Sequence, residues 1–140
     1  MLPSRADGHF AATKSPIEHM RILAVALRLD AADTAVRVAA RVDRQFERGL
    51  LDEIRGLLAS GVPADARALS GLVYRQAMEH LRGVRDEPAT RALIAQENRR
   101  YARRQLTWFR KEPEVIWFAG PGESPATIAA VSALFDEHLS

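Results

Sequence analysis

The sequence holds three groups of side chains whose types and spacing could contact a phosphate or a nucleic-acid base. The first comprises Arg37, Arg41, Asp43 and Arg44, and its three arginines lie at positions i, i+4 and i+7 and therefore share one face of a helix. If that face points at the carboxyl end of a sheet, its guanidinium groups can meet a phosphate group. The same spacing also fits a solvent-exposed face paired with Asp33 and Glu47, and spacing alone favours this second interpretation.

The second group is the stretch Gly71-Leu72-Val73-Tyr74-Arg75-Gln76, which places a ring, a guanidinium and an amide next to a helix. Side chains of these kinds can stack on an unpaired base and hydrogen-bond to its edge. The alternative is a core tyrosine beside two surface residues. The residues by themselves leave both interpretations open.

The third group is Arg99 to Arg110, which lies within a strongly basic stretch at residues 91–111. That stretch has seven basic residues and one acid, Glu97, so its charge is +6, whereas the rest of the chain (13 basic, 17 acidic) sums to −4. Basic stripes with interleaved aromatic rings suit a nucleic-acid backbone and its bases. A solvated helix is the alternative, but like charges four residues apart repel, which favours an anionic partner. The stripes are Arg99, Arg103 and Arg110, and beside them Arg100, Arg104 and Lys111, with Gln105, Thr107 and Trp108 among them.

Two short strands and five helical stretches are predicted to position these groups. Apolar runs at residues 21–29 and 114–119 have the length and composition of buried strands. Asp30 or Asp33 can cap the helix that follows the first strand, and Ser124 with Pro125 can open the last one. The expected helices are 31–48, 50–60, 66–82, 88–111 and 125–139.

Apolar residues at helical spacing predict which faces turn inward. Val38, Val42 and Phe46 form one stripe, and Leu50, Ile54, Leu57 and Leu58 form another. On the long helix at residues 88–111, the expected apolar face consists of Ile94, Tyr101 and Trp108, with Ala102 and Phe109 beside them.

The expected fold is mainly α with two short strands. Two strands cannot make a stable independent sheet, and strands that are apolar throughout usually lie inside a parallel sheet. We therefore expect this chain to be part of a larger α/β protein and to lack the strands with which its own two strands would pair. The expected regions are an irregular lead-in at 1–19, a main region at 20–120 and a C-terminal amphipathic helix within 121–140.

Length and composition exclude several classes of function. The chain has 140 residues, enough for one ordinary core, and no cysteine for a disulfide or a thiolate site. Lys14 and Lys111 are its only lysines, and neither follows the glycines of a P-loop. The four histidines are too dispersed to predict a metal site. With no membrane-length apolar run and no signal peptide, we expect a cytoplasmic protein.

Three stretches, in order, resemble the C-terminal part of the tRNA dimethylallyltransferase (tRNA isopentenyltransferase) family. They are R-V-D-R at residues 41–44 with G-L-L-D-E-I-R at 49–55, Y-R-Q at 74–76, and R-R-Q-L-T-W-F-R at 103–110. The last is similar to the family's run of two basic residues, Gln, an aliphatic residue, Thr, Trp, an aliphatic residue and Arg. The resemblance covers roughly residues 17–120.

This resemblance implies a P-loop α/β enzyme that transfers a dimethylallyl group from dimethylallyl diphosphate to tRNA. The acceptor is the exocyclic amine of the adenosine 3′ to the anticodon, flipped out of the anticodon stem-loop, and Mg²⁺ assists the diphosphate with ligands outside this chain. The resemblance makes Arg41 a diphosphate contact. It also implies that two further stretches contact tRNA. Their residues are Ser70, Gly71, Leu72, Val73, Tyr74, Arg75, Gln76, Arg103, Arg104, Gln105, Leu106, Thr107, Trp108, Phe109 and Arg110.

Two departures from the family pattern shape these expectations. Val73 stands where the family has glycine, so the backbone there approaches RNA less closely. The family's N-terminal half, with its P-loop and catalytic aspartate, has no counterpart here, so we expect the chain alone to be inactive. It would be a truncated, split or remnant form, with a P-loop half supplied by another chain in the split case. The rival hypotheses are a stand-alone RNA-binding helical module and a protein-interaction module whose strand edges dock on a partner.

Overall fold

A computed structural model describes residues 21–139, and the lead-in expected at 1–19 lies outside the described residues. The described part of the chain contains first strand β1 (Ala24–Arg28), followed by helices α1 (Ala31–Glu47) and α2 (Leu50–Ala59). A 3₁₀ turn, η1 (Arg67–Ser70), leads into α3 (Leu72–Leu81) and the long α4 (Glu87–Phe109). Strand β2 (Val115–Ala119) and α5 (Pro125–Leu139) complete it. The expected fold class, mainly helical with two short strands, is confirmed.

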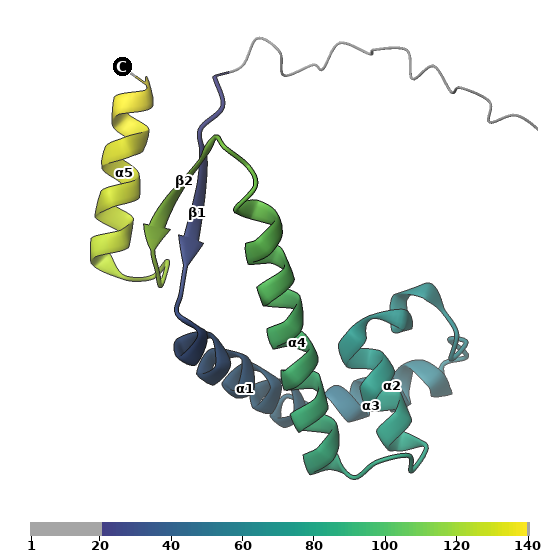
Figure 1. Cartoon of the computed structure of the whole chain (residues 1–140). Coiled ribbons are helices and arrows are strands. Elements are labelled where there is room, and N and C mark those ends of the chain that lie inside the picture. Colours follow the sequence, from purple (N-terminus) through teal and green to yellow (C-terminus); the bar gives the residue numbers. More distant parts are fainter. Residues whose placement is uncertain (1–20, 140) are drawn as a thin grey trace, which may run out of the picture.

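The two strands pair with each other in parallel, in the register Ala24 to Val115 through Arg28 to Ala119. The expectation that both would lack a partner in this chain was therefore wrong. The strands lie at one end of the molecule beside α5, while α2 and α3 lie at the other end (Figure 1). Helices α1 and α4 connect the two ends, and the whole segment from α1 to α4 forms the crossover that parallel strands require.

Local signals explain where the helices begin and end. Asp30 caps α1 by accepting a hydrogen bond from the Asp33 amide at 2.7 Å, and Asp86 caps α4 by accepting one from the Ala89 amide at 2.8 Å. Gly49 has φ +91°, a left-handed conformation that separates α1 from α2. The single helix expected at 66–82 was wrong, because extended backbone at Gly71 (ψ 148°) interrupts it between η1 and α3.

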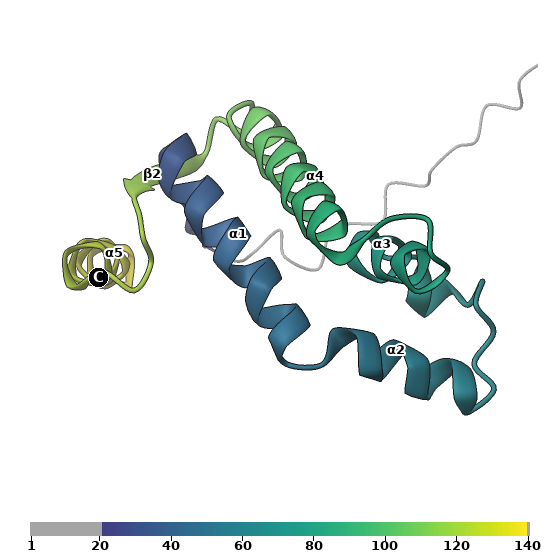
Figure 2. The same ribbon diagram turned by 90° about the horizontal axis from the view of Figure 1, so that it is seen from below.

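The buried core lies in the helical end of the molecule. It contains Val42 and Phe46 of α1, Leu50 and Ile54 of α2, Leu69 of η1, Ala77 and Met78 of α3, and Ile94 and Ala95 of α4. Helices α1 and α4 pack side by side, and α3 packs on α4 (Figure 2). Both inward stripes predicted for the first two helices contribute to this core.

The apolar face expected along the whole of α4 is only half correct. Ile94 is fully buried, but Tyr101, Trp108 and Phe109 are 52%, 62% and 42% exposed. The buried residues of α4 all belong to its first half. The second half extends past the helical core, so the described part of the chain covers its aromatic rings only in part.

Helix α5 is attached to the sheet through β2. The Thr127 hydroxyl donates to the Ala119 carbonyl at 2.8 Å, and Thr127 is the buried residue of this helix. Ile128, Phe135 and Leu139 stay exposed. No helix within residues 21–139 is long and apolar enough to cross a membrane.

Candidate nucleic-acid interface

The second half of α4 and the two residues after it carry cations that make no ion pair within the described residues. The ion pairs found there involve Arg37, Arg55, Arg75, Arg85 and Arg91 instead. The unpaired cations are Arg99, Arg100, Arg103, Arg104, Arg110 and Lys111, and all but Arg99 are exposed. No carboxylate of residues 21–139 is in ion-pair contact with them, and such a surface suits an anionic partner.

A groove of about 700 Å³ runs between α4 and the start of α3. Arg75 contributes to it from α3, so the structure joins the second and third groups of the sequence. The wall also includes an exposed indole, that of Trp108, and one carboxylate, that of Glu97. The groove is lined by Leu72, Arg75, Glu97, Arg100, Arg103, Arg104, Thr107, Trp108 and Lys111.

A second, smaller pocket of about 240 Å³ lies against another face of α4, at the carboxyl end of β1. Arg28 joins Arg99, Arg103 and Arg110 there, beside Asp30 at the N-terminus of α1. Arg103 borders both this pocket and the groove. Cationic surface therefore continues around the helix from one depression to the other.

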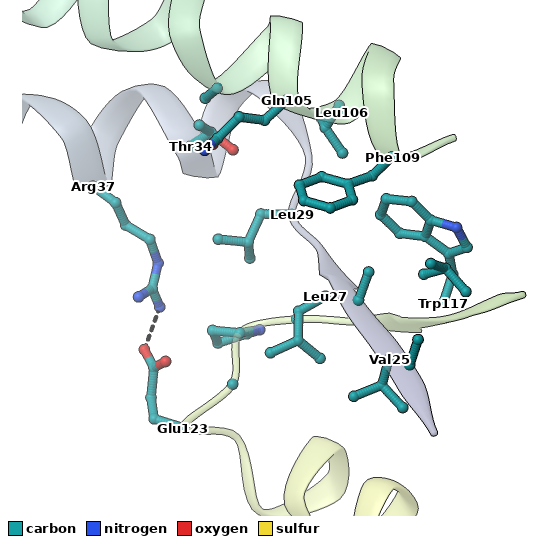
Figure 3. Close-up of a pocket in the computed structure, with 17 residues that line it drawn as sticks. Val25, Leu27, Leu29, Thr34, Arg37, Gln105, Leu106, Phe109, Trp117 and Glu123 are labelled. Atoms are coloured by element: carbon teal, nitrogen blue, oxygen red, sulfur yellow. Dashed lines mark hydrogen bonds and ion pairs between the residues drawn. The ribbon is translucent and has the colours of Figure 1, made fainter. Parts of the chain in front are cut away.

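The run at residues 103–110 wraps around α4 and does not form one face. Thr107 and Trp108 line the groove, while Gln105 and Phe109 line an apolar pocket of about 550 Å³ on the sheet side. In Figure 3 the Phe109 ring lies between Leu29 and Trp117, and Val25 and Leu27 of β1 project into the same pocket. Leu106 also lines the sheet-side pocket.

The expected trio Tyr74, Arg75 and Gln76 does not converge on one place. Gln76 is 5% exposed, and its amide donates to Glu97 at 3.1 Å and accepts from Arg85. The Tyr74 hydroxyl donates to Glu53 at 2.9 Å, and this hydrogen bond to a carboxylate raises the pKa of Tyr74. Of the three, only Arg75 lines the groove.

The rest of the second group lies around a pocket of about 360 Å³ that also contains Tyr74. Gly71, Leu72 and Val73 line it, and Leu72 also borders the groove. The Ser70 hydroxyl donates to the Arg67 carbonyl at 2.7 Å within η1. These residues are therefore neighbours of the groove, but most of them face away from it.

The arginines of the first group have separate surroundings. Arg37 pairs with Glu123 at 2.5 Å, in place of the Asp33 or Glu47 partners considered from the sequence. Arg41 and Arg44 are exposed and make no ion pair within residues 21–139. Arg41 lines neither the groove nor the smaller cationic pocket.

Sequence reasoning left Arg100, Lys111 and Glu97 out of the candidate site. Arg100 and Lys111 were part of the charge stripe, and their spacing from Arg104 and Thr107 (four residues each) places them on the groove face. Glu97 carried a weaker signal, since it is the single acid of the basic stretch. Residues 21–139 contain no group of three or more His, Asp or Glu side chains that could hold a metal ion, so none of them is assigned to Mg²⁺.

Fold and site together define an α/β unit whose surface carries a cation-lined groove. A family model described as IPP transferase matches residues 4–112. The chain therefore belongs to the IPP transferase family.

Individual relatives agree with this assignment. The chain is 38% identical over 119 residues to tRNA dimethylallyltransferase 1 of Pelobacter propionicus, a match that covers 85% of this chain and 38% of the relative. It is 44% identical over 99 residues to tRNA dimethylallyltransferase 1 of Trichlorobacter lovleyi, a match that covers 71% of this chain and 32% of the relative. The chain thus spans about a third of the length of these relatives.

A solved structure shows the same fold. The tRNA isopentenylpyrophosphate transferase of Bacillus halodurans superposes with a TM-score of 0.75 at 27% identity, covering 84% of this chain and 39% of that one. The resemblance stated from the sequence is confirmed at the level of family.

Proposed function

We propose that this chain is the tRNA-binding C-terminal part of a tRNA dimethylallyltransferase. The observation that carries the proposal is the groove whose cations have no carboxylate partner within residues 21–139, apart from the Arg75–Glu97 contact. An RNA backbone supplies the missing negative charge, and the exposed Trp108 ring offers a stacking surface for a base. The names of the relatives supply the substrate class, tRNA, and the group transferred.

Within this proposal the anticodon stem-loop lies against α4 and the start of α3. Arg103, Arg104 and Arg110 contact phosphates, and Arg75 extends the cationic wall from α3. Arg41 contacts the diphosphate of dimethylallyl diphosphate. Its exposed guanidinium, unpaired within the described residues, is free to take an anionic partner. The reacting adenosine and the P-loop belong to the part of the enzyme that this chain does not span.

The sheet side of the molecule supports the proposal that this chain binds tRNA while another part of the enzyme carries the P-loop. The apolar pocket of about 550 Å³ beside β1 exposes Val25 and Leu27, which are 40% and 45% exposed. Since a two-stranded sheet is marginal in water, we propose that a P-loop half docks here and completes the sheet. The activity then requires both parts, and the chain alone transfers no prenyl group.

Titration of an anticodon stem-loop with the 140-residue chain at several salt concentrations tests the proposal. Each phosphate contact contributes about 0.7–0.9 to the slope of log K against log salt. The triple variant Arg103→Ala, Arg104→Ala, Arg110→Ala should lower that slope by about 2 and weaken binding at least tenfold. A control with the same charge loss, Arg48→Ala, Arg67→Ala, Arg82→Ala, uses exposed arginines outside the groove and should keep the slope. Equal slopes in the two variants would refute the assignment of the groove.

A stand-alone RNA-binding module is the second candidate, favoured by the fact that all the cations named above lie in this chain. The two functions differ in their response to the donor. For the transferase part completed by a P-loop half, dimethylallyl diphosphate should tighten RNA binding. For the stand-alone module it should have no effect.

A further inference from the structure

One carboxylate stands within the otherwise cationic wall of the groove. Glu97 is the single acid of residues 91–111, and it lines the groove together with Arg75 and Arg100. Its side chain is 24% exposed, less than half the exposure of Arg75. A carboxylate at this position repels phosphate, so it weakens the electrostatic binding of an RNA backbone.

The surroundings of Glu97 hold its carboxylate in place. Oε2 accepts a hydrogen bond from the Gln76 side-chain amide at 3.1 Å and lies 3.9 Å from the nearest guanidinium nitrogen of Arg75. Gln76 is in turn fixed by Arg85, which also pairs with Glu79. A buried amide with both ends bonded leaves the carboxylate little rotational freedom.

One oxygen of this carboxylate is left without a partner among residues 21–139. The contacts of Glu97 within this part of the chain go to Oε2, so Oε1 of this groove-lining residue keeps its capacity to accept a hydrogen bond. Glu97 does not neutralise the arginines of its own helix, because its ion pair is with Arg75 of α3. The group is therefore a fixed acceptor surrounded by groups that attract nucleic acid.

We propose that Glu97 is a base-reading residue that selects an unpaired guanine in the bound RNA. The inference rests on the proposed tRNA-binding function. On its Watson–Crick edge guanine presents two adjacent donors, N1–H and the N2 amino group, which match a carboxylate and form charge-assisted hydrogen bonds. Uracil presents one N3–H between two carbonyl oxygens, which the carboxylate repels.

Arg75 and Trp108 serve different parts of the same strand. The Arg75 guanidinium lies beside Glu97 and offers a plane on which the selected base can stack. Trp108 lies eleven residues after Glu97 along α4, or about 16 Å by helical rise, so it stacks on a different nucleotide. The groove thus reads one base at its α3 end and holds another by stacking at its far end.

Fluorescence anisotropy with three 12-nucleotide single-stranded RNAs tests the proposal. The probes are oligouridine, a repeat of U-U-G, and the same repeat with inosine, which lacks the N2 amino group, in place of guanosine. The wild-type chain should bind the guanosine probe about tenfold more tightly than oligouridine, within the range of about 1–3 kcal/mol for a bidentate contact. The inosine probe should fall between them.

The variant Glu97→Gln keeps an oxygen that can accept the Gln76 hydrogen bond but loses the charge. It should bind oligouridine at least as tightly as wild type and reduce the preference for guanosine to threefold or less. Glu112→Gln removes the same charge from an exposed acid after the end of α4 and should keep the tenfold preference. Far-UV circular dichroism checks that both variants are folded.

The outcomes separate this inference from the proposed function. Salt-dependent binding of all three probes with no preference, or a preference that survives in Glu97→Gln, overturns the role of Glu97 and leaves the proposed function intact. If neither the three probes nor the anticodon stem-loop bind at low salt, both the role of Glu97 and the proposed function are overturned.

Discussion

A guanidinium nitrogen of Arg37, in α1, lies 2.5 Å from a carboxylate oxygen of Glu123, 86 residues later in the chain. The pair joins the first helix to the turn that follows β2, across the mouth of the apolar pocket shown in Figure 3. Both side chains are largely exposed, at 49% and 67%, so the pair orients the turn more than it stabilises the fold.

The Arg37–Glu123 pair predicts a specific pH dependence. The pKa of Glu123 lies below its ordinary value of 4.5, first because its own backbone amide donates to the carboxylate and next because Arg37 does. A lowered carboxyl pKa means that the contact persists above the unfolded-state pKa and is lost as the pH falls through the folded-state pKa. The turn should therefore loosen only below about pH 4.5.

Carbon-detected NMR titration of the Glu123 carboxyl group tests this. In Arg37→Gln the midpoint should rise but stay below 4.5, because the backbone contribution remains. Arg48→Gln removes the same charge just after the end of α1 and should leave the midpoint where it is. A midpoint that does not respond to Arg37→Gln would show that the pair does not persist in solution.

Substitution by alanine at two glycines of the segment that contains the start of α2 and its interior should change the free energy of unfolding in opposite directions. Gly49 has φ +91°, where a Cβ costs about 1–2 kcal/mol, so Gly49→Ala should destabilise the chain by about that amount. Gly56 lies inside α2, and a Cβ added there would meet no atom within 4 Å, so Gly56→Ala should stabilise the chain by about 0.5–1 kcal/mol. Urea unfolding measures both, and effects of equal sign would contradict the left-handed conformation at Gly49.

Substitutions in the first half of α4 should lower the stability of the chain, whereas substitutions in its second half should lower the affinity for RNA. Ile94 is fully buried, so Ile94→Ala should cost about 2–5 kcal/mol of unfolding free energy. Trp108 is 62% exposed, so Trp108→Ala should change stability by less than about 1 kcal/mol while weakening RNA binding by about 1–3 kcal/mol. Urea unfolding and anticodon stem-loop binding measure the two effects. A large loss of stability in Trp108→Ala would assign the ring to the core.

Complementation should reveal the division of the enzyme. The pure chain should transfer no dimethylallyl group to an anticodon stem-loop, and activity should appear when the segment of the Pelobacter propionicus relative that this chain does not match is added. The double variant Val25→Asp, Leu27→Asp places charges in the apolar pocket and should abolish this complementation. Its control, Val36→Asp, alters an exposed apolar residue that does not line that pocket and should have little effect. Turnover by the pure chain would refute the proposal.

Local patterns were sufficient for most of the elements and for much of the core. The cap of α1, which the sequence narrowed to Asp30 or Asp33, and the apolar spacing of Val42, Phe46 and Ile54 depend on residues within one or two turns, so one sequence is enough to predict them. The charge imbalance of residues 91–111 can be read from the sequence for the same reason and predicts an anionic ligand, while the resembling runs indicated the family.

Other features depended on segments far apart in the chain. Periodicity predicted that Tyr101 and Trp108 belong to the same apolar face as Ile94, but burial requires that another element packs on that face, and both rings stay more than half exposed. Only the tertiary structure showed that Gln76 is buried between Glu97 and Arg85, since that placement requires α3 to pack on α4. It also decided that Arg75, and not Tyr74 or Gln76, faces the groove. Composition and spacing thus determined which residues form helices and carry charge, because those properties are local, whereas the direction of each side chain was decided by packing between segments distant in sequence.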